Sequence, residues 1–281
     1  MIDLHTHSNA SDGTEPPALV VRQAVRAGLT AVALTDHDTT TGWEEAADEA
    51  RRTGIVLVPG IEVSCSRRGR SVHLLAYLPD PEHPGLVGEL RRARSSRDTR
   101  LDRMVARMAA DGIPVSVEAV RAQVEPGATA GRPHIADALV EAGVVVDRRE
   151  AFDRWLGNDG PYYVGHYAPD PVRAVEVVRA AGGVAVVAHP HSVTRGRVVS
   201  DSLLEEMADA GMAGIEVRHR DHTPEAQRHL ADLARALDLF VTGASDYHGE
   251  GKPNRLGENT TDPEVLVEIE ASATGTWVVR P

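Results

Sequence analysis

The amino-acid sequence predicts an α/β fold that carries a helical insertion. Short apolar runs recur along its 281 residues, and each run is followed by a polar or acidic residue and then by a helical pattern. This alternation predicts parallel strands joined by helical crossovers. The length suits one large domain, or one domain with an insertion. A hydrophobic content of 42% and a charged content of 26% are ordinary for a globular protein.

Seven apolar runs have the length of buried strands. They are Ile2–His5, Ala31–Thr35, Val56–Val63, Val72–Tyr77, Val184–Ala188, Gly214–Val217 and Phe240–Thr242. Helical stretches between them are Pro16–Ala27, Thr41–Arg52, Pro171–Ala181, Asp201–Ala210 and Pro224–Ala236. Most of these helices begin at a proline or end before a glycine, which is the usual asymmetry of helix ends. Seven such strands fit a closed or nearly closed barrel about as well as an open doubly wound sheet, so the pattern alone leaves both possible.

One region interrupts the alternation. Between about Pro81 and Pro169 an arginine-rich helical run, Glu89–Met108, is followed by shorter helices at Val117–Gln123 and His134–Ala142. The apolar positions of the long run recur at helical spacing. We therefore predict three parts: residues 1–80 and 170–281 form the α/β barrel or sheet, and residues 81–169 form a helical insertion that caps the substrate.

The charge and cysteine content limit the possible partners and location. A formal net charge of −12 argues against a broad basic surface for long duplex nucleic acid. It leaves room for a small anion at a local positive site, which bound divalent metals could supply. The single cysteine allows no intrachain disulfide and favours a reducing compartment. Without a signal peptide or an 18-residue apolar run, we expect a cytoplasmic protein with no membrane partner.

The first seven residues suggest a metal site. Asp3, His5 and His7 alternate directly behind an apolar start. In a β-strand, residues at this spacing point to the same face. Neutral imidazoles suit zinc, iron, nickel or copper, and mixed sets of imidazoles and carboxylates also accept manganese. Taken alone, however, the His-x-His pattern is equally compatible with a hairpin edge.

Other metal-competent side chains lie on or after the remaining predicted strands. With the two histidines above, the candidate metal ligands are His5, His7, Asp12, His37, Glu62, His73, His189, Asp246 and His248. In parallel α/β folds functional groups gather at the carboxyl ends of the strands. We therefore expect these nine side chains at one mouth, enough for two or three ions. Asp3, Asp36 and Asp38 are candidates to accept the second N–H of the imidazoles.

These motifs resemble those of a known family. Asp3-x-His5-x-His7, Asp12, Thr35–Asp38, Pro59–Glu62, Ala188–Pro190 and Ser245-Asp246-x-His248 resemble, in order, the motifs of the PHP (polymerase and histidinol phosphatase) family. The segment Gly131–Ala136 resembles one branch of that family, the stand-alone phosphoesterases with a helical insertion. Members of that branch hydrolyse nucleoside 3',5'-bisphosphates and short 5'-phosphorylated oligonucleotides. The resemblance implies a distorted seven-stranded (β/α) barrel with a trinuclear site.

The resemblance also implies how the ligands are shared. His5, His7, Glu62 and Asp246 would hold one ion, and Asp12, His37 and His248 a second. His73 and His189 would complete a third, with Glu62 as a bridge. The donor set fits manganese, iron or zinc without preference. In such a site a metal-bound hydroxide attacks the phosphorus, so no protein nucleophile is required.

Three further residues are candidates for substrate binding or catalysis. Arg132 can grip phosphate through its planar fork of donors, and His134 could donate to the same phosphate or to the leaving oxygen. His222 follows the sixth predicted strand and could also contact phosphate. Two of them have a plainer interpretation: Arg132 could make a surface salt bridge, and His222 could be a helix-capping histidine. The arginines between Arg91 and Arg107 are interpreted mainly as a solvated helix face, with a contact of Arg97 or Arg100 with the substrate as the alternative.

Two other functions compete with nucleotide phosphoester hydrolysis. A histidinol-phosphate phosphatase would share the metal-binding motifs, although the Gly131–Ala136 segment and the helical insertion favour nucleotides. A DNA-binding module is the second alternative, because Val117–Gly143 has the pattern of a helix-turn-helix. The acidic net charge and the lack of a basic recognition helix argue against that module.

Overall fold

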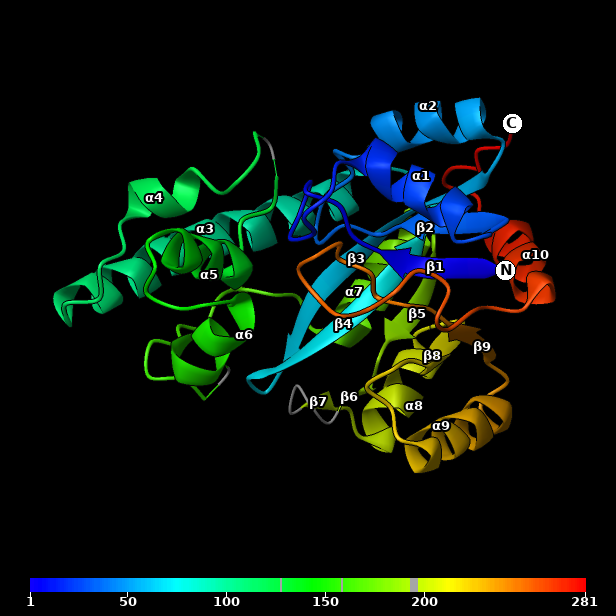
Figure 1. The fold of residues 1–281 in the computed structure, drawn as a ribbon. Helices are drawn as coiled ribbons and strands as arrows, with labels where there is room; N and C mark the ends of the chain where they lie inside the picture. The colour runs from blue at the N-terminus through cyan, green and yellow to red at the C-terminus, as the bar shows by residue number, and fades with distance from the viewer. Residues whose placement is uncertain (127, 158, 193–196) are drawn as a thin grey trace.

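The computed structural model describes residues 1–126, 128–157, 159–192 and 197–281. Its centre is a seven-stranded mixed sheet that curls into a distorted, nearly closed barrel with helices around it (Figure 1). In spatial order the strands are β1 (Ile2–Thr6), β2 (Ala31–Leu34), β3 (Val56–Arg67), β4 (Arg70–Tyr77), β5 (Val184–Ala188), β8 (Gly214–Arg218) and β9 (Phe240–Gly243). All seven strands expected from the sequence are present, and the open doubly wound sheet is excluded.

The first strand and the chain around β9 meet across the gap in the barrel. The backbone N–H of His7 donates to the carbonyl of Tyr247 at 2.8 Å, and the N–H of Thr261 donates to the carbonyl of Ile2 at 2.9 Å. The buried Asp3 carboxylate accepts the N–H of Ser245 at 3.0 Å. These bonds bring the motif at the start of the chain next to the motif near its end.

The direction of β4 differs from the prediction that all the strands are parallel. β4 pairs antiparallel with β3 and with β5. Its turn from β3 has only two residues, Arg68 at φ 52° and Gly69 at φ 78°, and positive φ at both positions is the geometry of a type I′ hairpin turn. Because β4 is reversed, its amino-terminal half lies beside the carboxyl ends of its neighbours. His73 therefore reaches the same mouth as residues that follow the parallel strands.

The helices that cover the barrel agree closely with the predicted stretches. They are α1 (Pro17–Arg26), α2 (Trp43–Thr53), α7 (Pro171–Ala180), α8 (Asp201–Asp209) and α9 (Pro224–Ala236). Their apolar faces bury residues such as Val21 on α1 and Leu204 on α8 against the sheet. The sequence did not indicate α10 (Pro263–Ser272) or the small hairpin of β6 (His191–Ser192) and β7 (Arg197–Val198).

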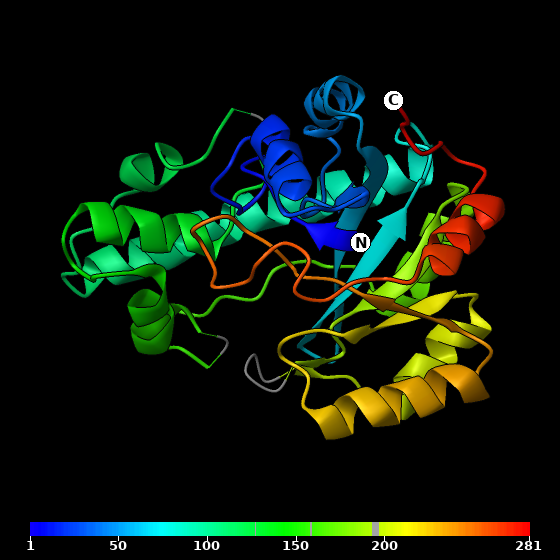
Figure 2. The same ribbon diagram turned by 45° about the vertical axis from the view of Figure 1, so that its right-hand side comes forward.

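The region between β4 and α7 is helical, as expected. It contains α3 (Pro84–Ala110), α4 (Val117–Arg121), α5 (Arg132–Glu141), α6 (Arg148–Ala151) and a short π-helical turn, η1 (Phe152–Leu156). Buried apolar residues between Leu101 and Val164 pack into a cluster distinct from the clusters around the sheet. In both ribbon views this region projects to one side of the barrel (Figures 1 and 2). Among the described residues, no helix has the length and apolarity needed to cross a membrane.

Candidate metal centre

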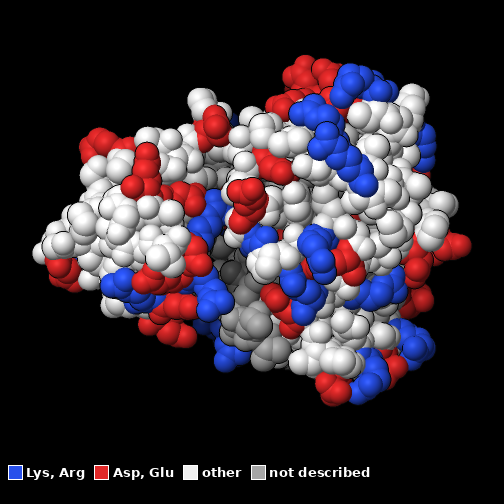
Figure 3. All heavy atoms as spheres, viewed as in Figure 1, with Lys and Arg blue, Asp and Glu red and all other residues white. Residues whose placement is uncertain are grey.

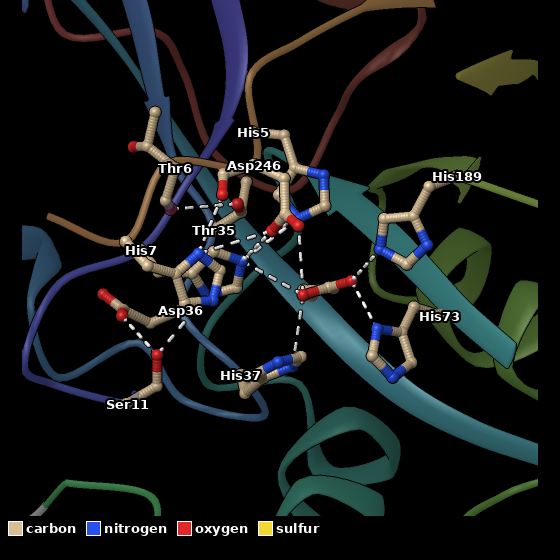
Figure 4. A network of polar contacts seen from close by, with 12 residues as sticks. His5, Thr6, His7, Ser11, Thr35, Asp36, His37, His73, His189 and Asp246 are labelled. Atoms are coloured by element: carbon tan, nitrogen blue, oxygen red, sulfur yellow. Dashed lines mark hydrogen bonds and ion pairs between the residues drawn. The ribbon is translucent and has the colours of Figure 1, made fainter. Parts of the chain in front are cut away.

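Histidines and carboxylates from opposite ends of the chain converge at the mouth of the barrel (Figure 4). All nine predicted ligands take part in groups whose donor atoms lie within 4.8 Å of one another. These groups are His7–Asp12–His37–His248, His5–Glu62–His189–Asp246 and His37–Glu62–His73. Eight of the nine side chains are buried, and Asp12 is 15% exposed. So many buried ionisable groups require compensating partners.

The Glu62 carboxylate lies at the centre of these groups. One oxygen, Oε2, lies 3.3, 3.1 and 3.2 Å from nitrogens of His5, His7 and His37. The other oxygen, Oε1, lies 2.6 and 3.1 Å from nitrogens of His73 and His189. Burial would raise the pKa of Glu62, but the neighbouring imidazoles outweigh it and hold this pKa well below its usual range. The carboxylate faces two separate sets of imidazoles, which is the geometry of a bridging ligand.

The pair of histidines on β1 has a geometry that suits a cation. Nδ1 of His5 lies 3.0 Å from the carboxylate of Glu216, which favours a proton on this nitrogen and leaves Nε2 facing the mouth. Nε2 lies 3.1 Å from Nε2 of His7 and 3.6 Å from Oδ1 of Asp246. Electron-rich atoms this close repel one another unless a proton or a metal ion lies between them. The donor set therefore fits a bound divalent metal.

A second set surrounds Asp12. Its Oδ1 lies 3.2 Å from Nε2 of His248, and its Oδ2 lies 3.9 Å from Nε2 of His37. Oδ1 of Asp12 and Nε2 of His248 are buried and make no hydrogen bond to any described residue. Buried polar atoms are normally satisfied, so close approach without hydrogen bonding again fits a cation. His7 lies between the two sets: its Nδ1 is 3.7 Å from Oδ1 of Asp12, and its Nε2 is 3.1 Å from Nε2 of His5, with which the resemblance implies that it shares an ion.

Glu216 on β8 is a functional residue that the sequence analysis missed. Besides its contact with His5, its second oxygen accepts the backbone N–H of His189 at 2.8 Å. The carboxylate is fully buried. It therefore orients two of the metal-competent residues at once. The available signal was an acid within the apolar run Gly214–Val217, the same signal that singled out Glu62.

The three aspartates expected to support the imidazoles act differently. Asp3 accepts backbone N–H groups of His5, Ser245 and Gly257 and contacts no imidazole in the described residues. Burial raises the pKa of Asp3 to about 6 despite these bonds. Asp36 accepts the Ser11 hydroxyl at 2.6 Å, and that hydroxyl lies 3.4 Å from Nδ1 of His7. Asp36 thus supports an imidazole only through a serine.

Asp38 supports an arginine of the helical region instead of an imidazole. Its Oδ2 lies 3.0 Å from Nε of Arg97 on α3, and its Oδ1 accepts the N–H of Ser64 at 2.8 Å. Arg97 also donates to the Ser64 hydroxyl. Because Ser64 pairs with His73 across β3 and β4, Arg97 lies at the border of the metal-competent mouth.

Arg97, Arg100 and Arg132 line a cavity of about 10 Å³ together with Gly131 and Ile135, room for one water molecule unless the arginine side chains move apart. We call this the arginine pocket. Burial, and then the charge of Arg97, lowers the pKa of Arg100 to about 10. Burial and the charges of the three arginines likewise lower the pKa of His166 to about 3. Nε of Arg100 is buried without a hydrogen-bond partner among the described residues. The pocket is therefore electropositive inside an acidic protein.

Aromatic rings and a backbone carbonyl hold the arginines in place. The guanidinium of Arg100 lies 5.1 Å from the ring centre of Tyr163, and that of Arg132 lies 5.4 Å from the ring centre of Phe152. Nη1 of Arg132 donates to the carbonyl of Leu156 at 2.6 Å. Lys and Arg side chains gather on both sides of the hollow between the helical region and the barrel (Figure 3). Arg97 and Arg100 are not part of a solvated helix face, and they are the two arginines for which a contact with substrate was the alternative.

The two histidines predicted to contact substrate have different surroundings. His134 is buried beside Asp12, and its Nδ1 accepts the N–H of Gly131 at 3.0 Å, which leaves a proton on Nε2 of the neutral ring. Burial lowers the pKa of His134 and favours this neutral form. His222 uses Nδ1 for the carbonyl of Val217 and Nε2 for the N–H of His191. Both of its nitrogens have backbone partners, which argues against a contact with phosphate.

The helical region is also tied to the loop that carries Asp12. The N–H of Thr129 donates to the carbonyl of Ala10 at 3.0 Å. Nη1 of Arg148 donates to the carbonyl of Asp12 at 3.0 Å, while Nε of the same side chain donates to Asp137 at 2.6 Å. These contacts position the arginine pocket relative to the mouth.

Comparison with known proteins supplies the family. Residues 3–115 match the model of the PHP domain. A 3',5'-nucleoside bisphosphate phosphatase from Chromobacterium violaceum is 35% identical over 261 residues, which cover 93% of this chain and 92% of that protein. The chain belongs to the PHP family. A second relative of this PHP protein, a 5'-3' exoribonuclease from Haemophilus influenzae, is 33% identical over 259 residues, covering 92% of this chain and 93% of that protein.

A solved structure extends the likeness of this PHP protein to the whole fold. A protein from Bifidobacterium adolescentis, assigned by prediction as a metal-dependent phosphoesterase, superposes with a TM-score of 0.94 at 42% identity. The match covers 97% of this chain and 96% of that one. The PHP protein described here is accordingly a metal-dependent phosphoesterase.

Proposed function

We propose that this phosphoesterase acts on small nucleotides that carry a second phosphate, namely nucleoside 3',5'-bisphosphates and short 5'-phosphorylated oligonucleotides. The observation that carries the proposal is the arginine pocket at the border of the metal-competent mouth. One phosphate would lie at the mouth and the other at the arginines. The names of the two relatives, a bisphosphate phosphatase and an exoribonuclease, agree with such substrates.

We infer that two or three divalent ions, manganese, iron or zinc, bind at the mouth. Glu62 would bridge them, because its two oxygens face different imidazoles. The remaining ligands would be His5, His7, Asp12, His37, His73, His189, Asp246 and His248. When bound, such ions lower the pKa of coordinated water and neutralise phosphate oxygens as these gain charge.

Side chains of the helical region would bind and orient the substrate. Buried Arg100 and half-buried Arg132 would grip the second phosphate with forked donors. Arg97 would stay anchored on Asp38 and set the distance between pocket and mouth. His134, with its proton on Nε2 beside Asp12, would donate to a phosphate or to the leaving oxygen. We assign no contact with substrate to His222.

We further propose that residues 1–80 and 170–281 form the catalytic barrel and that residues 81–169 cap the substrate. The separate apolar cluster between Leu101 and Val164 supports this division. The net charge of −12 supports small substrates over long duplex nucleic acid. The single cysteine supports a cytoplasmic location.

Neither alternative function would use the arginine pocket. A histidinol-phosphate phosphatase needs the metal site but has only one phosphate to bind. For a DNA-binding module, α4 and α5 would have to present a free recognition helix. Instead, Val120 on α4 and Ile135 and Leu139 on α5 are buried in the core of the helical region.

A substrate panel tests the proposal. The kinetics of three enzymes are measured: the wild type, Arg132→Ala and the exposed control Arg149→Ala. Each is given adenosine 3',5'-bisphosphate, a short 5'-phosphorylated RNA and histidinol phosphate. We expect the first two substrates to be preferred and Arg132→Ala to raise their KM by about 10-fold or more, since a charge-assisted hydrogen bond contributes about 1.5–3 kcal/mol. Preference for histidinol phosphate, or an Arg132→Ala variant with unchanged kinetics, would contradict the proposal.

A further inference from the structure

A second group of metal-competent side chains lies away from the nine at the mouth. It consists of His191 on β6, Asp201 at the start of α8 and His229 on α9, and their donor atoms lie within 4.8 Å of one another. The ribbon views show that α8, α9 and the β6–β7 hairpin are neighbours on one side of the barrel (Figures 1 and 2). None of the three residues belongs to the groups around Glu62.

We propose that His191, Asp201 and His229 form a peripheral site for one divalent transition metal, with Zn²⁺ as the ion of best fit. Two imidazoles and one carboxylate are a donor set that zinc accepts, with a fourth position left for water. The softer nitrogen donors favour zinc over magnesium or calcium, which prefer oxygen ligands. The three ligands come from three separate elements, so a bound ion would link β6, α8 and α9.

The present geometry needs only small changes to close around an ion. Nε2 of His229 already lies 2.9 Å from Oδ1 of Asp201, and both side chains are about half exposed, at 47% and 46%, so they can rotate. The rings of His191 and His229 are nearly parallel, with centres 5.5 Å apart and planes inclined by 20°. Tetrahedral zinc with bonds of about 2.0–2.1 Å requires donor atoms roughly 3.3 Å apart, which such rotations can reach.

His191 supplies an independent observation. Its Nε2 is buried and has no hydrogen-bond partner in the part of the chain that the structure describes. Its backbone is fixed separately, because its N–H donates to Nε2 of His222 at 3.1 Å and its strand pairs with Val198. A simple ion pair between His229 and Asp201 would leave the buried nitrogen of His191 unsatisfied, whereas an ion shared by all three would satisfy it.

A metal ion at this site would cross-link β6, α8 and α9 beside the mouth of the barrel. His191 follows His189 by two residues, and the N–H of His189 is held by Glu216. Linking β6 to α8 and α9 would stabilise this part of the barrel, because an ion that binds only the folded chain shifts the folding equilibrium toward it. The site is not needed for hydrolysis, since no catalytic group is among its ligands.

Zinc binding to the manganese-loaded holoenzyme tests the proposal. Equilibrium dialysis with elemental analysis would count Zn²⁺ and Mn²⁺ per chain in the wild type, His229→Ala, Asp201→Asn and the control Asp209→Asn, an exposed residue of the same helix. We expect the wild type and Asp209→Asn to bind one more Zn²⁺ per chain than the two site variants. Zinc should also raise the midpoint of thermal unfolding of the wild type and Asp209→Asn by at least about 2 °C more than that of His229→Ala and Asp201→Asn.

The outcomes separate this site from the active site. His229→Ala should keep its manganese content and its phosphoesterase activity, because it lies outside the catalytic machinery. Equal zinc stoichiometry in the wild type and His229→Ala, or an equal zinc-dependent shift of their midpoints, would overturn the proposal. Neither result would bear on the proposed substrate, and failure on the substrate panel would leave the zinc result intact.

Discussion

The barrel mouth and the arginine pocket differ in charge and in the elements that build them. The mouth gathers acids and imidazoles on strands and on the loops that directly follow them, where the hydrogen-bonded sheet fixes each backbone position. The pocket gathers guanidinium groups on and around helices, held by aromatic rings and by few contacts with the barrel. The mouth has the donor groups of a cation site, and we propose that the pocket binds the anion that identifies the substrate. In that proposal, reaction and substrate selection are built on different elements.

The two regions also differ in how their side chains are supported. At the mouth, Glu216 orients His5 and His189, and Asp36 reaches His7 through Ser11. The pocket is joined to the barrel by Arg97 on Asp38 and by nearby backbone contacts of the helical region. If this division is correct, changes at the mouth should reduce turnover on every substrate. Changes in the helical region should instead act through binding.

The largest expected effect is at the mouth. Asp246→Ala removes a carboxylate 3.6 and 3.5 Å from the nitrogens of His5 and His7. We expect kcat to fall by roughly 1000-fold, in the range seen when a preorganised electrostatic group is removed from an active site. Steady-state kinetics on the substrate panel would measure it, with the exposed Asp232→Ala as control. A loss of activity confined to substrates with two phosphates would contradict the assignment of Asp246 to the reaction itself.

The next effect concerns the stability of the helical region. Leu139 on α5 is fully buried in the cluster between Leu101 and Val164. Leu139→Ala should destabilise this region by about 2–5 kcal/mol, because it leaves a cavity. Limited proteolysis should then cut within residues 81–169 first, while the metal content stays unchanged. The matched variant Leu204→Ala, in the core around the sheet, should not expose those sites. Loss of metal in Leu139→Ala would show that the regions are not separable.

A smaller effect is expected for Glu216→Gln. The amide keeps the shape of the side chain but loses the charge that orients His5 and His189. Replacing such a supporting residue typically lowers metal affinity or activity by about 10–100-fold. A metal titration followed by activity would measure the change. If high metal concentration restored most of the activity, Glu216 would be confirmed as a residue that positions the metal ligands. A metal titration curve identical to that of the wild type would contradict this role.

The sequence predicted the mouth well because its signals are local. His5 and His7 alternate on one strand, and Glu62 interrupts an apolar run, so each could be recognised from its immediate neighbours. The reversed direction of β4 was not predicted, although Arg68 and Gly69 form the two-residue turn that enforces it. Asp3 was assigned to the imidazoles because it lies in their motif, but folding brings it to the backbone of Ser245.

The arginine pocket was predicted only in part because its signals are distant. Arg132 was selected from a short motif, while Arg97 and Arg100 lie among several arginines with the same local pattern. Only packing against Tyr163 and the mouth distinguishes these two from their solvated neighbours. Contacts with residues about 60 positions away in the chain decide their burial, and the spacing of residues within α3 gives no sign of such contacts.

One measurement tests the division between reaction and selection most directly. It is the ratio of kcat/KM for adenosine 3',5'-bisphosphate to that for adenosine 3'-monophosphate, in the wild type and in Arg100→Leu. We expect a wild-type ratio of about 10 or more, since a hydrogen bond to a charged group contributes about 1.5–3 kcal/mol. Arg100→Leu should bring the ratio close to 1 by lowering only the bisphosphate value. An equal fall for both substrates, with the ratio unchanged, would contradict a separate site for the second phosphate.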